Sequence, residues 1–335
     1  SNVSTVDRID YSNDTATASA KGPLSAARSY MGATGTSTHG YFAGDWTYKT
    51  TIDRVDYSND TATASPRGNL FVGRGYMGGT GARENGFDNI LGPALVENIL
   101  RPSYPITSFG YFAGSPSNTT VVERFNFSND TENAVPRSTQ TEQILSATGT
   151  GSDSFGYIGG GYGYNSPDDK RSKVERLDYN NDTANTVVKG SLTVARYHLE
   201  ATGNNSFGYY AGGYDGSAVS SRVDRIDYSN DTTTAVAKGP MTIIRQQFGG
   251  MGNQSFGYFA GAWVSSSIVD RVDYSNDTPT ASARGNLATA TGRNTAVGNA
   301  NFGYIVGGYS PRTLVQRIDY SNDTATATPK GPVTE

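Results

Sequence analysis

The chain lacks the residues on which several kinds of functional site depend. No cysteine occurs among its 335 residues, which excludes disulfides, thiolate metal sites and a thiol nucleophile. Only two histidines are present, His39 and His198, in different parts of the sequence pattern, so we expect neither a histidine metal site nor a catalytic dyad. No apolar run approaches the roughly 20 residues that span a bilayer. No block of like charge stands out at a net charge of −4. We therefore expect no cofactor, no metal, no membrane insertion and no nucleic acid partner.

The most prominent feature that is present is a repeated ten-residue phrase, Asp-Tyr-Ser-Asn-Asp-Thr-Ala-Thr-Ala-Ser. It begins at Asp10 and Asp56 and returns with small changes at five places: Asn126, Asp178, Asp227, Asp273 and Asp319. Its aromatic second residue recurs every 46 to 52 residues, apart from one step of 70. Among known repeats, a period in the high forties is typical of β-propeller blades.

Residues 206–253 show what one repeat contains. Its four stretches of strand-like sequence are Ser206–Gly213, Arg222–Tyr228, Thr232–Val236 and Met241–Gly250. A glycine pair ends the first stretch, and the second and third show period-2 alternation of polar and apolar residues. A Ser-Asn-Asp turn separates the second from the third, and a Gly-Pro turn separates the third from the fourth. Four short strands per repeat predict an all-β fold, a β-propeller of four-stranded blades with strands a to d running outward from the axis.

The number of blades follows from counting the repeats. The phrase, which predicts the c–d hairpin, occurs seven times, whereas the glycine-ended b strand occurs six times. We expect a single propeller domain over residues 1–335, cut in mid-repeat at both ends. Seven blades are favoured, the last completed by the N-terminal hairpin and an a–b pair beyond Glu335. Six blades with a spare hairpin are the alternative.

The order of these signals resembles the kelch repeat. The glycine pairs that match are Gly159-Gly160, Gly212-Gly213 and Gly307-Gly308. The arginines that open the next strand are Arg28, Arg74, Arg196 and Arg245. The kelch tryptophan after the hairpin is replaced by small residues such as Ala16, Ala62 and Thr233. The phrasing also resembles repeat proteins of marine bacteriophage tail fibres. These resemblances imply a kelch-like propeller in a larger extracellular or virion fibre.

Charged residues that recur in every repeat are expected to be structural. Each phrase has one turn aspartate, such as Asp182 or Asp231, without the alternating oxygen ligands of a calcium loop. The Asp-Arg step of each c strand predicts packing between blades. A cation ends each d strand, where a charge at an exposed edge discourages strand addition. These cations are Lys21, Arg67, Arg137, Lys189, Lys238, Arg284 and Lys330.

Function is expected where the repeats differ, foremost in the b–c connections. These connections vary in length and contain both tryptophans of the chain. The candidate ligand-binding residues are Trp46, Tyr48, Tyr162, Tyr164, Tyr214, Trp263 and Tyr309. Exposed rings among Asn, Ser, Asp and Gly are typical of sugar or protein recognition. The alternative is that these rings pack against neighbouring blades.

The second irregularity is an insertion at residues 83–105, in the a–b loop of one blade. Apolar residues at helical spacing lie between Pro93 and Pro102, which predicts a short helix. The candidate contact residues for another subunit are Leu95, Val96, Ile99 and Leu100. The alternative is a helix folded over its own blade.

The sequence thus favours a non-enzymatic binding or adhesion module that recognises a cell-surface glycan or protein receptor. It lacks the aspartate boxes of sialidase-like propellers and the cysteine of galactose-oxidase-like propellers. One alternative is a structural propeller within a multi-subunit assembly, with other subunits as partners. A weaker alternative is a carbohydrate-active enzyme. The expected location is extracellular or on a virion surface.

Overall fold

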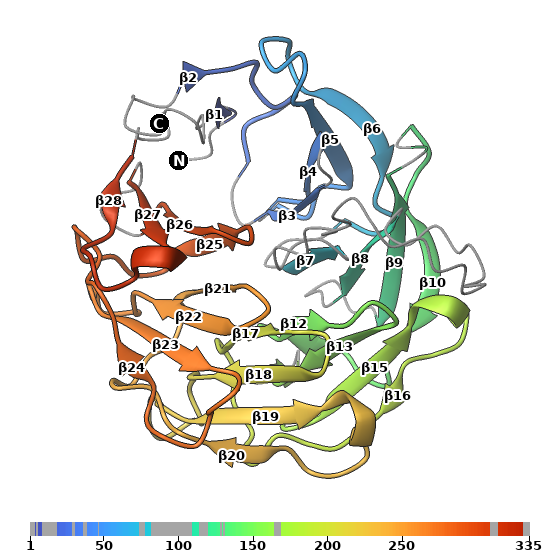
Figure 1. Cartoon of the computed structure of the whole chain (residues 1–335). Helices are drawn as coiled ribbons and strands as arrows, with labels where there is room; N and C mark the ends of the chain where they lie inside the picture. Colours follow the sequence, from blue (N-terminus) through green and yellow to red (C-terminus); the bar gives the residue numbers. More distant parts are fainter. Residues whose placement is uncertain are drawn as a thin grey trace, which may run out of the picture.

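A ring of antiparallel sheets surrounds a central axis (Figure 1). The computed structural model describes residues 4, 6–8, 19–28, 31–35, 39–45, 47–73, 78–81, 109–113, 120–127, 129, 131–163, 169–308 and 314–330. Six of the sheets have four strands and form the blades. In each blade the first strand in sequence lies nearest the axis and the fourth lies on the rim.

The strands follow the chain blade by blade. Blade 1 contains β3 (Gly32–Gly35), β4 (His39–Ala43), β5 (Thr51–Asp56) and β6 (Ser65–Asn69). Blade 2 contains β7 (Gly78–Gly81), β8 (Phe109–Ala113), β9 (Val121–Asn126) and β10 (Val135–Thr139). Blade 3 contains β12 (Thr148–Gly151), β13 (Phe155–Gly159), β15 (Val174–Asp178) and β16 (Val187–Val188). Blade 4 contains β17 (Glu200–Gly203), β18 (Phe207–Ala211), β19 (Val223–Asp227) and β20 (Val236–Lys238). Blade 5 contains β21 (Gly249–Gly252), β22 (Phe256–Ala260), β23 (Val269–Asp273) and β24 (Ser282–Ala283). Blade 6 contains β25 (Thr295–Gly298), β26 (Phe302–Val306), β27 (Val315–Asp319) and β28 (Thr328–Pro329).

Two smaller sheets and three short helices complete the described structure. The first sheet pairs β1 (Asp7–Arg8) with β2 (Ser19–Ala20), and the second pairs β11 (Ile144–Leu145) with β14 (Tyr162–Gly163). Three 3-10 helices, η1 (Tyr179–Asn181), η2 (Tyr228–Asn230) and η3 (Tyr320–Asn322), lie in the c–d turns. Each begins after an aspartate whose side chain accepts a hydrogen bond from the second residue of the helix, which is the Asx-turn chemistry of the Asp-Tyr-Ser-Asn phrase.

The all-β propeller of four-stranded blades is confirmed, but the prediction of seven blades is wrong for the described residues. The seventh copy of the phrase forms only the two-stranded β1–β2 hairpin, which lies in the ring between blades 6 and 1 (Figure 1). Counting phrases therefore counted a hairpin that has no a–b pair among the described residues. Six complete blades with one further hairpin, the alternative, is what the structure contains.

The hydrophobic core is divided into layers between successive blades. One layer joins Tyr209 and Val223 of blade 4 to Phe259 and Val272 of blade 5, all buried. The aromatic of the phrase belongs to these layers, because its ring stacks on the b-strand tyrosine of the preceding blade. Tyr209 and Tyr274, for example, stack with centroids 4.6 Å apart at an interplanar angle of 15°. Adjacent blades are therefore held together by the same rings that define the repeat.

The turn aspartate of the phrase has a larger role than forming its turn. Asp277 of blade 5 accepts hydrogen bonds or ion pairs from three residues of blade 4: the Tyr209 hydroxyl at 2.8 Å, Arg225 at 2.7 Å and Lys238 at 3.0 Å. Asp182, Asp231 and Asp323 make the same set of contacts with the blade before them. We call each such group an aspartate clamp.

The clamp corrects one expectation about the rim. The cation that ends the d strand was predicted to lie at an exposed edge, yet the Lys238 side chain is only 11% exposed and pairs with Asp277. Its charge stabilises the contact between blades. The Arg of the c-strand step also pairs across the blade boundary, as predicted. The Asp of the same step points inward and pairs within its own blade: Asp224 with Arg196 at 2.8 Å, both fully buried.

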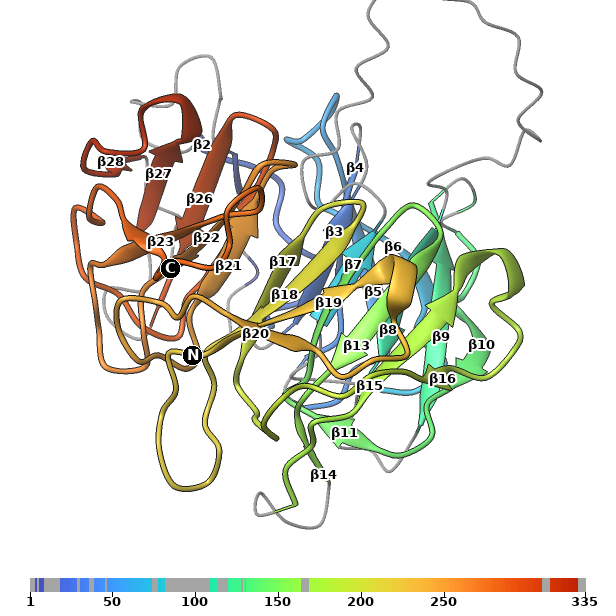
Figure 2. The ribbon, with the colours of Figure 1, turned by 60° about the horizontal axis from the view of Figure 1, so that its bottom comes forward.

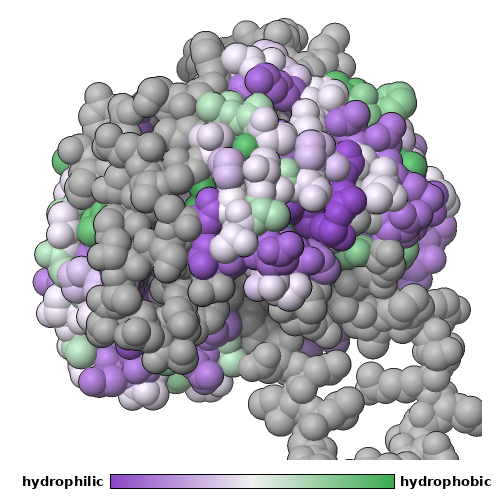
Figure 3. Space-filling view, turned by 90° about the horizontal axis from the view of Figure 1, so that it is seen from above, coloured by the Kyte–Doolittle hydropathy of each residue, from purple (hydrophilic) through white to green (hydrophobic). Residues whose placement is uncertain are grey.

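The described surface at the upper edge of the ring is mostly hydrophilic. Figure 3, which views the ring from the upper edge of Figure 1, shows only small, scattered hydrophobic areas among the described residues. The predicted helix at 91–101, with Leu95, Val96, Ile99 and Leu100, lies outside the described residues. Within the described part of the chain, no helix is long and apolar enough to cross a membrane.

Candidate functional site

The b–c connections and the d–a connections meet on one face of the ring. In blade 3 they pair directly, since β11 belongs to the d–a connection and β14 to the b–c connection. Both strands lie below the blades in Figure 2. The same pairing recurs in blade 4, where the backbones of Tyr197 and Tyr214 exchange hydrogen bonds of 3.2 and 2.9 Å. We call this side the b–c face.

Four of the seven predicted ligand-binding residues lie within the described structure. Tyr48 and Trp263 are 46% and 42% exposed, whereas Tyr162 and Tyr214 are half-buried. Trp46, Tyr164 and Tyr309 lie outside the described residues. Among exposed apolar side chains, Ile244 (60%) belongs to the d–a connection of blade 5 and Val264 (79%) follows Trp263. Several large apolar side chains are therefore exposed in these connections.

Tyr162 and Tyr214 contact a third ring that the sequence did not single out. Tyr197 lies between them, with ring centroids 5.0 Å from Tyr162 and 5.6 Å from Tyr214, both edge-on. It comes from the d–a connection entering blade 4, directly after the buried Arg196. The alternative that these rings pack against neighbouring blades is partly correct, because Tyr162 of blade 3 contacts Tyr197 of blade 4.

Trp263 contacts the d–a connection that enters blade 6. The Arg293 guanidinium lies over its indole ring at 3.8 Å from the centroid. The Trp263 backbone NH donates to the Gln246 carbonyl at 2.8 Å. These two contacts fix the ring beside residue 247 while leaving part of it open to solvent. A cation on one side of a half-exposed indole is a contact of about 0.5–1 kcal/mol at such sites.

His198 and Gln247 lie between the tyrosines and the tryptophan. The His198 ring packs edge-on against Tyr197 at 4.8 Å, and its Nε2 lies 3.1 Å from the Gln247 side-chain nitrogen. Burial, with a contribution from the Arg293 charge, lowers the pKa of His198 to about 4. The imidazole is therefore neutral at physiological pH and acts by hydrogen bonding rather than by charge.

These contacts form one continuous series of residues from four blades, in which Gln247 and Arg293 are joined by a backbone hydrogen bond and the other neighbours by their side chains. The series runs through Tyr162, Tyr197, His198, Gln247, Arg293 and Trp263. We call it the b–c arc. The sequence identified its two ends and missed its centre, because Gln247 and Arg293 are common surface residues. Their position in the repeat was the signal that could have found them. His198, Gln247 and Arg293 each lie two residues after the place that Arg196 and Arg245 occupy, and the residue at this place differs from blade to blade.

Glu200 begins the inner strand of blade 4, two residues after His198. No described residue donates a hydrogen bond to its carboxyl group or forms an ion pair with it. Burial alone raises the pKa of Glu200 to about 8. The described part of the chain contains no group of three or more His, Asp or Glu side chains arranged to hold a metal ion.

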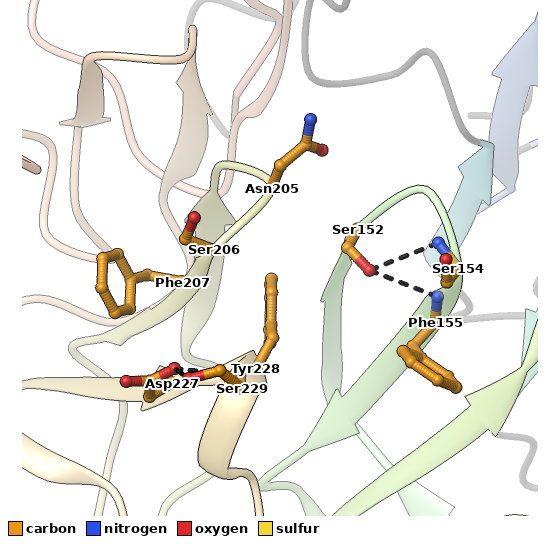
Figure 4. Close-up of a pocket in the computed structure, with 9 residues that line it drawn as sticks. All are labelled: Ser152, Ser154, Phe155, Asn205, Ser206, Phe207, Asp227, Tyr228 and Ser229. Carbon is orange, nitrogen blue, oxygen red and sulfur yellow. Dashed lines mark hydrogen bonds between the residues drawn. The ribbon is translucent and has the colours of Figure 1, made fainter. Parts of the chain in front are cut away.

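The opposite face contains a shallow groove between blades 3 and 4 (Figure 4). Its lining comes from the a–b turns and a c–d turn, including Ser152, Asn205 and Tyr228. The Ser152 hydroxyl accepts hydrogen bonds from the backbone NH groups of Ser154 and Phe155, both at 3.3 Å. Asn204, Asn253 and Asn299 cap the corresponding turns of blades 4 to 6 in the same way. The groove is therefore a product of the repeat and lacks the differences between blades that mark the b–c arc.

Comparison with known proteins shows a similarity in fold and none in sequence. No protein-family model and no curated protein matches its sequence. Among solved structures, 416 chains match in fold. The structure of YjhT is similar over 92% of this chain and 98% of its own, with a TM-score of 0.66 and 9% sequence identity. At such low identity the likeness is one of architecture, and the chain shares the β-propeller fold with YjhT.

Proposed function

We propose that this protein is a non-enzymatic binding module, a kelch-like propeller that recognises a cell-surface glycan through its b–c face. The observation that supports the proposal is the b–c arc. It combines aromatic rings with neutral hydrogen-bonding groups at one place, and its residues differ between blades that share one repeat pattern. Sequence differences within a repeat framework are expected where a ligand, rather than the framework, sets the residue.

Glycan binding suits the arc better than binding to a flat protein surface. Sugar rings present apolar faces that cover an aromatic ring, and hydroxyls that need both donors and acceptors. Trp263 offers a partly exposed ring, and His198 and Gln247 offer neutral polar groups beside it. We further propose that the module belongs to a larger extracellular or virion fibre, on the strength of the repeat phrase.

Removal of the two tryptophans tests the proposal. We expect the purified chain to bind a subset of glycans on an array, and Trp263→Ala to weaken that binding at least roughly tenfold, since buried aromatic anchors dominate such interfaces. The double change Trp46→Ala with Trp263→Ala should abolish it. Surface plasmon resonance with the best glycan gives the affinities.

The control removes exposed apolar side chains from the rim instead. Val187 and Val188 of β16 are 51% and 45% exposed and lie far from the b–c connections in sequence and topology. Their replacement by alanine should leave glycan binding unchanged. Undiminished binding by the double tryptophan variant would refute the assignment to the b–c face. Cleavage of any bound glycan would refute the non-enzymatic part of the proposal.

A further inference from the structure

One backbone position on the b–c face adopts the left-handed conformation in four consecutive blades. Ser146, His198, Gln247 and Arg293 have φ values of 52°, 56°, 50° and 55°. They occupy equivalent places, two residues before the inner strands β12, β17, β21 and β25 begin. Tyr30 and Tyr76 hold the corresponding places in the sequence of blades 1 and 2 and lie outside the described residues. Left-handed backbone is unfavourable for every residue except glycine.

At the other described positions of positive φ the chain has glycine, with Tyr48 (φ 61°) as the one exception. The b strands of blades 3, 4 and 6 end in glycines of positive φ, at Gly160, Gly212 and Gly307. Glycine is therefore used freely in this fold, yet none of the four positions contains it. A non-glycine residue at a strained position in four blades indicates that the side chain itself is required.

The backbone of these residues does not need their side chains. Their peptide groups form a chain of hydrogen bonds around the axis. The NH of His198 donates to the Ser146 carbonyl (3.3 Å), that of Gln247 to the His198 carbonyl (3.1 Å) and that of Arg293 to the Gln247 carbonyl (3.0 Å). Glycine would form the same bonds. The shared backbone role therefore explains the conformation and leaves the choice of side chain unexplained.

We propose that these four residues form a specificity ring that selects a hydroxyl-rich sugar on the b–c face. The inference rests on the proposed glycan binding and names the residues that determine which sugar is bound. Ser, His and Gln each supply both a donor and an acceptor, as a sugar hydroxyl requires. Arg293 and Trp263 close one side of the ring.

Gln247 provides the second observation that points to a ligand. Its side-chain oxygen is buried from solvent and has no hydrogen-bond partner among the described residues. The nitrogen of the same amide lies beside the His198 ring, so the Gln247 oxygen without a partner is close to the neutral imidazole. A buried acceptor without a donor is unfavourable until a donor arrives, and a sugar hydroxyl is such a donor.

Glycine substitution separates a ligand-binding role from a structural one. We expect Gln247→Gly and His198→Gly to keep or raise the midpoint of thermal unfolding, because glycine relieves the left-handed strain. The same variants should lose at least tenfold in affinity for the best glycan, or change the order of preference on the array. Gln247→Asn, which keeps the amide on a shorter side chain, should retain part of the binding.

The outcomes distinguish this inference from the proposed function. If the wild-type chain binds no glycan, both fail. If it binds and Trp263→Ala abolishes binding while the glycine variants keep the wild-type affinity and preference, only the specificity ring fails. A large loss of stability in the glycine variants would also refute it, since that result assigns the side chains to the framework.

Discussion

Glu200 differs from every described residue at its position in the other inner strands. The corresponding residues are Thr148, Gly249 and Thr295 in the neighbouring blades. The missing side chain of Gly250 leaves room for it, because a Cβ there would lie 3.3 Å from the Glu200 Cβ. Burial without a compensating partner favours the protonated form of this half-buried carboxyl group, which raises its pKa to about 8.

This shift predicts a pH-dependent gain in stability for Glu200→Gln. The folded chain retains a proton that the unfolded chain loses above the ordinary pKa of 4.5. The cost of Glu200 to folding therefore grows as the pH rises from 4.5 to 8 and is complete above 8. The amide avoids this cost, so urea denaturation should show little difference at pH 4.5 and a stabilisation of a few kcal/mol at pH 9.

A matched change is available on an exposed turn. Glu132→Gln removes a solvated carboxyl and should not reproduce the pH-dependent gain. If the stability difference between wild type and Glu200→Gln is the same at pH 4.5 and pH 9, the pKa of Glu200 is not raised in the folded chain and the prediction is wrong.

At the scale of the element, each c–d hairpin stabilises the boundary with the blade before it. Burial alone would raise the pKa of Asp277, but hydrogen bonds from Lys238 and Tyr209 and the charge of Arg225 lower it below its ordinary value. The carboxylate is thus ionised and satisfied by two cations and a phenol. Removal of its charge leaves the cations largely buried and uncompensated.

The aspartate clamp predicts a graded pair of variants. Asp277→Asn should cost roughly 2–4 kcal/mol in free energy of unfolding, because two partly buried cations lose their anion. Tyr209→Phe keeps the stack on Tyr274 and loses one hydrogen bond, so it should cost about 1–2 kcal/mol. Chemical denaturation measures both. An Asp277→Asn variant within about 0.5 kcal/mol of wild type would show that the clamp adds nothing.

The sequence located these elements but not their partners. Period-2 alternation and turn residues placed the b and c strands correctly, because local chemistry determines them. The d strand predicted at Thr232–Val236 lies instead at Val236–Lys238, and the strand predicted at Met241–Gly250 is the shorter Gly249–Gly252. Tyr209 and Asp277 are 68 positions apart, and a single sequence contains no signal that joins them. The same limit applies to the b–c arc: Trp263 and Tyr162 were conspicuous by residue type, whereas Gln247 becomes notable only through its left-handed backbone and its neighbours.

At the scale of the whole molecule, close backbone contacts link each blade to the next. The glycine that follows each d strand touches the next c–d turn: a Cβ on Gly239 would lie 1.5 Å from the Pro279 carbonyl oxygen. Gly22, after the β1–β2 hairpin, is equally close to the Ala62 carbonyl oxygen of blade 1. The hairpin therefore contacts blade 1 as the d strand of a complete blade contacts the next blade. It contains the phrase without the a and b strands of a blade, so seven phrases accompany six blades.

These contacts predict large effects from single methyl groups. Gly239→Ala and Gly22→Ala should each lower the free energy of unfolding by about 3 kcal/mol or more, because backbone atoms must move to admit the Cβ. Gly149→Ala is the control, since its Cβ would meet only the Tyr157 carbonyl oxygen, at 3.6 Å. If Gly22→Ala is as mild as Gly149→Ala in calorimetry, the hairpin is outside the cooperative unit.

The hydrogen bond from each such glycine to the next turn has a consequence for how the molecule can change. Gly190 donates to Asp231, Gly239 to Asp277 and Gly285 to Asp323, at 2.7 to 2.9 Å. Each of these boundaries thus joins unlike sides of two units that share one repeat pattern. Duplication or exchange of whole blades would therefore keep this shared backbone contact while it brings new residues to the b–c face.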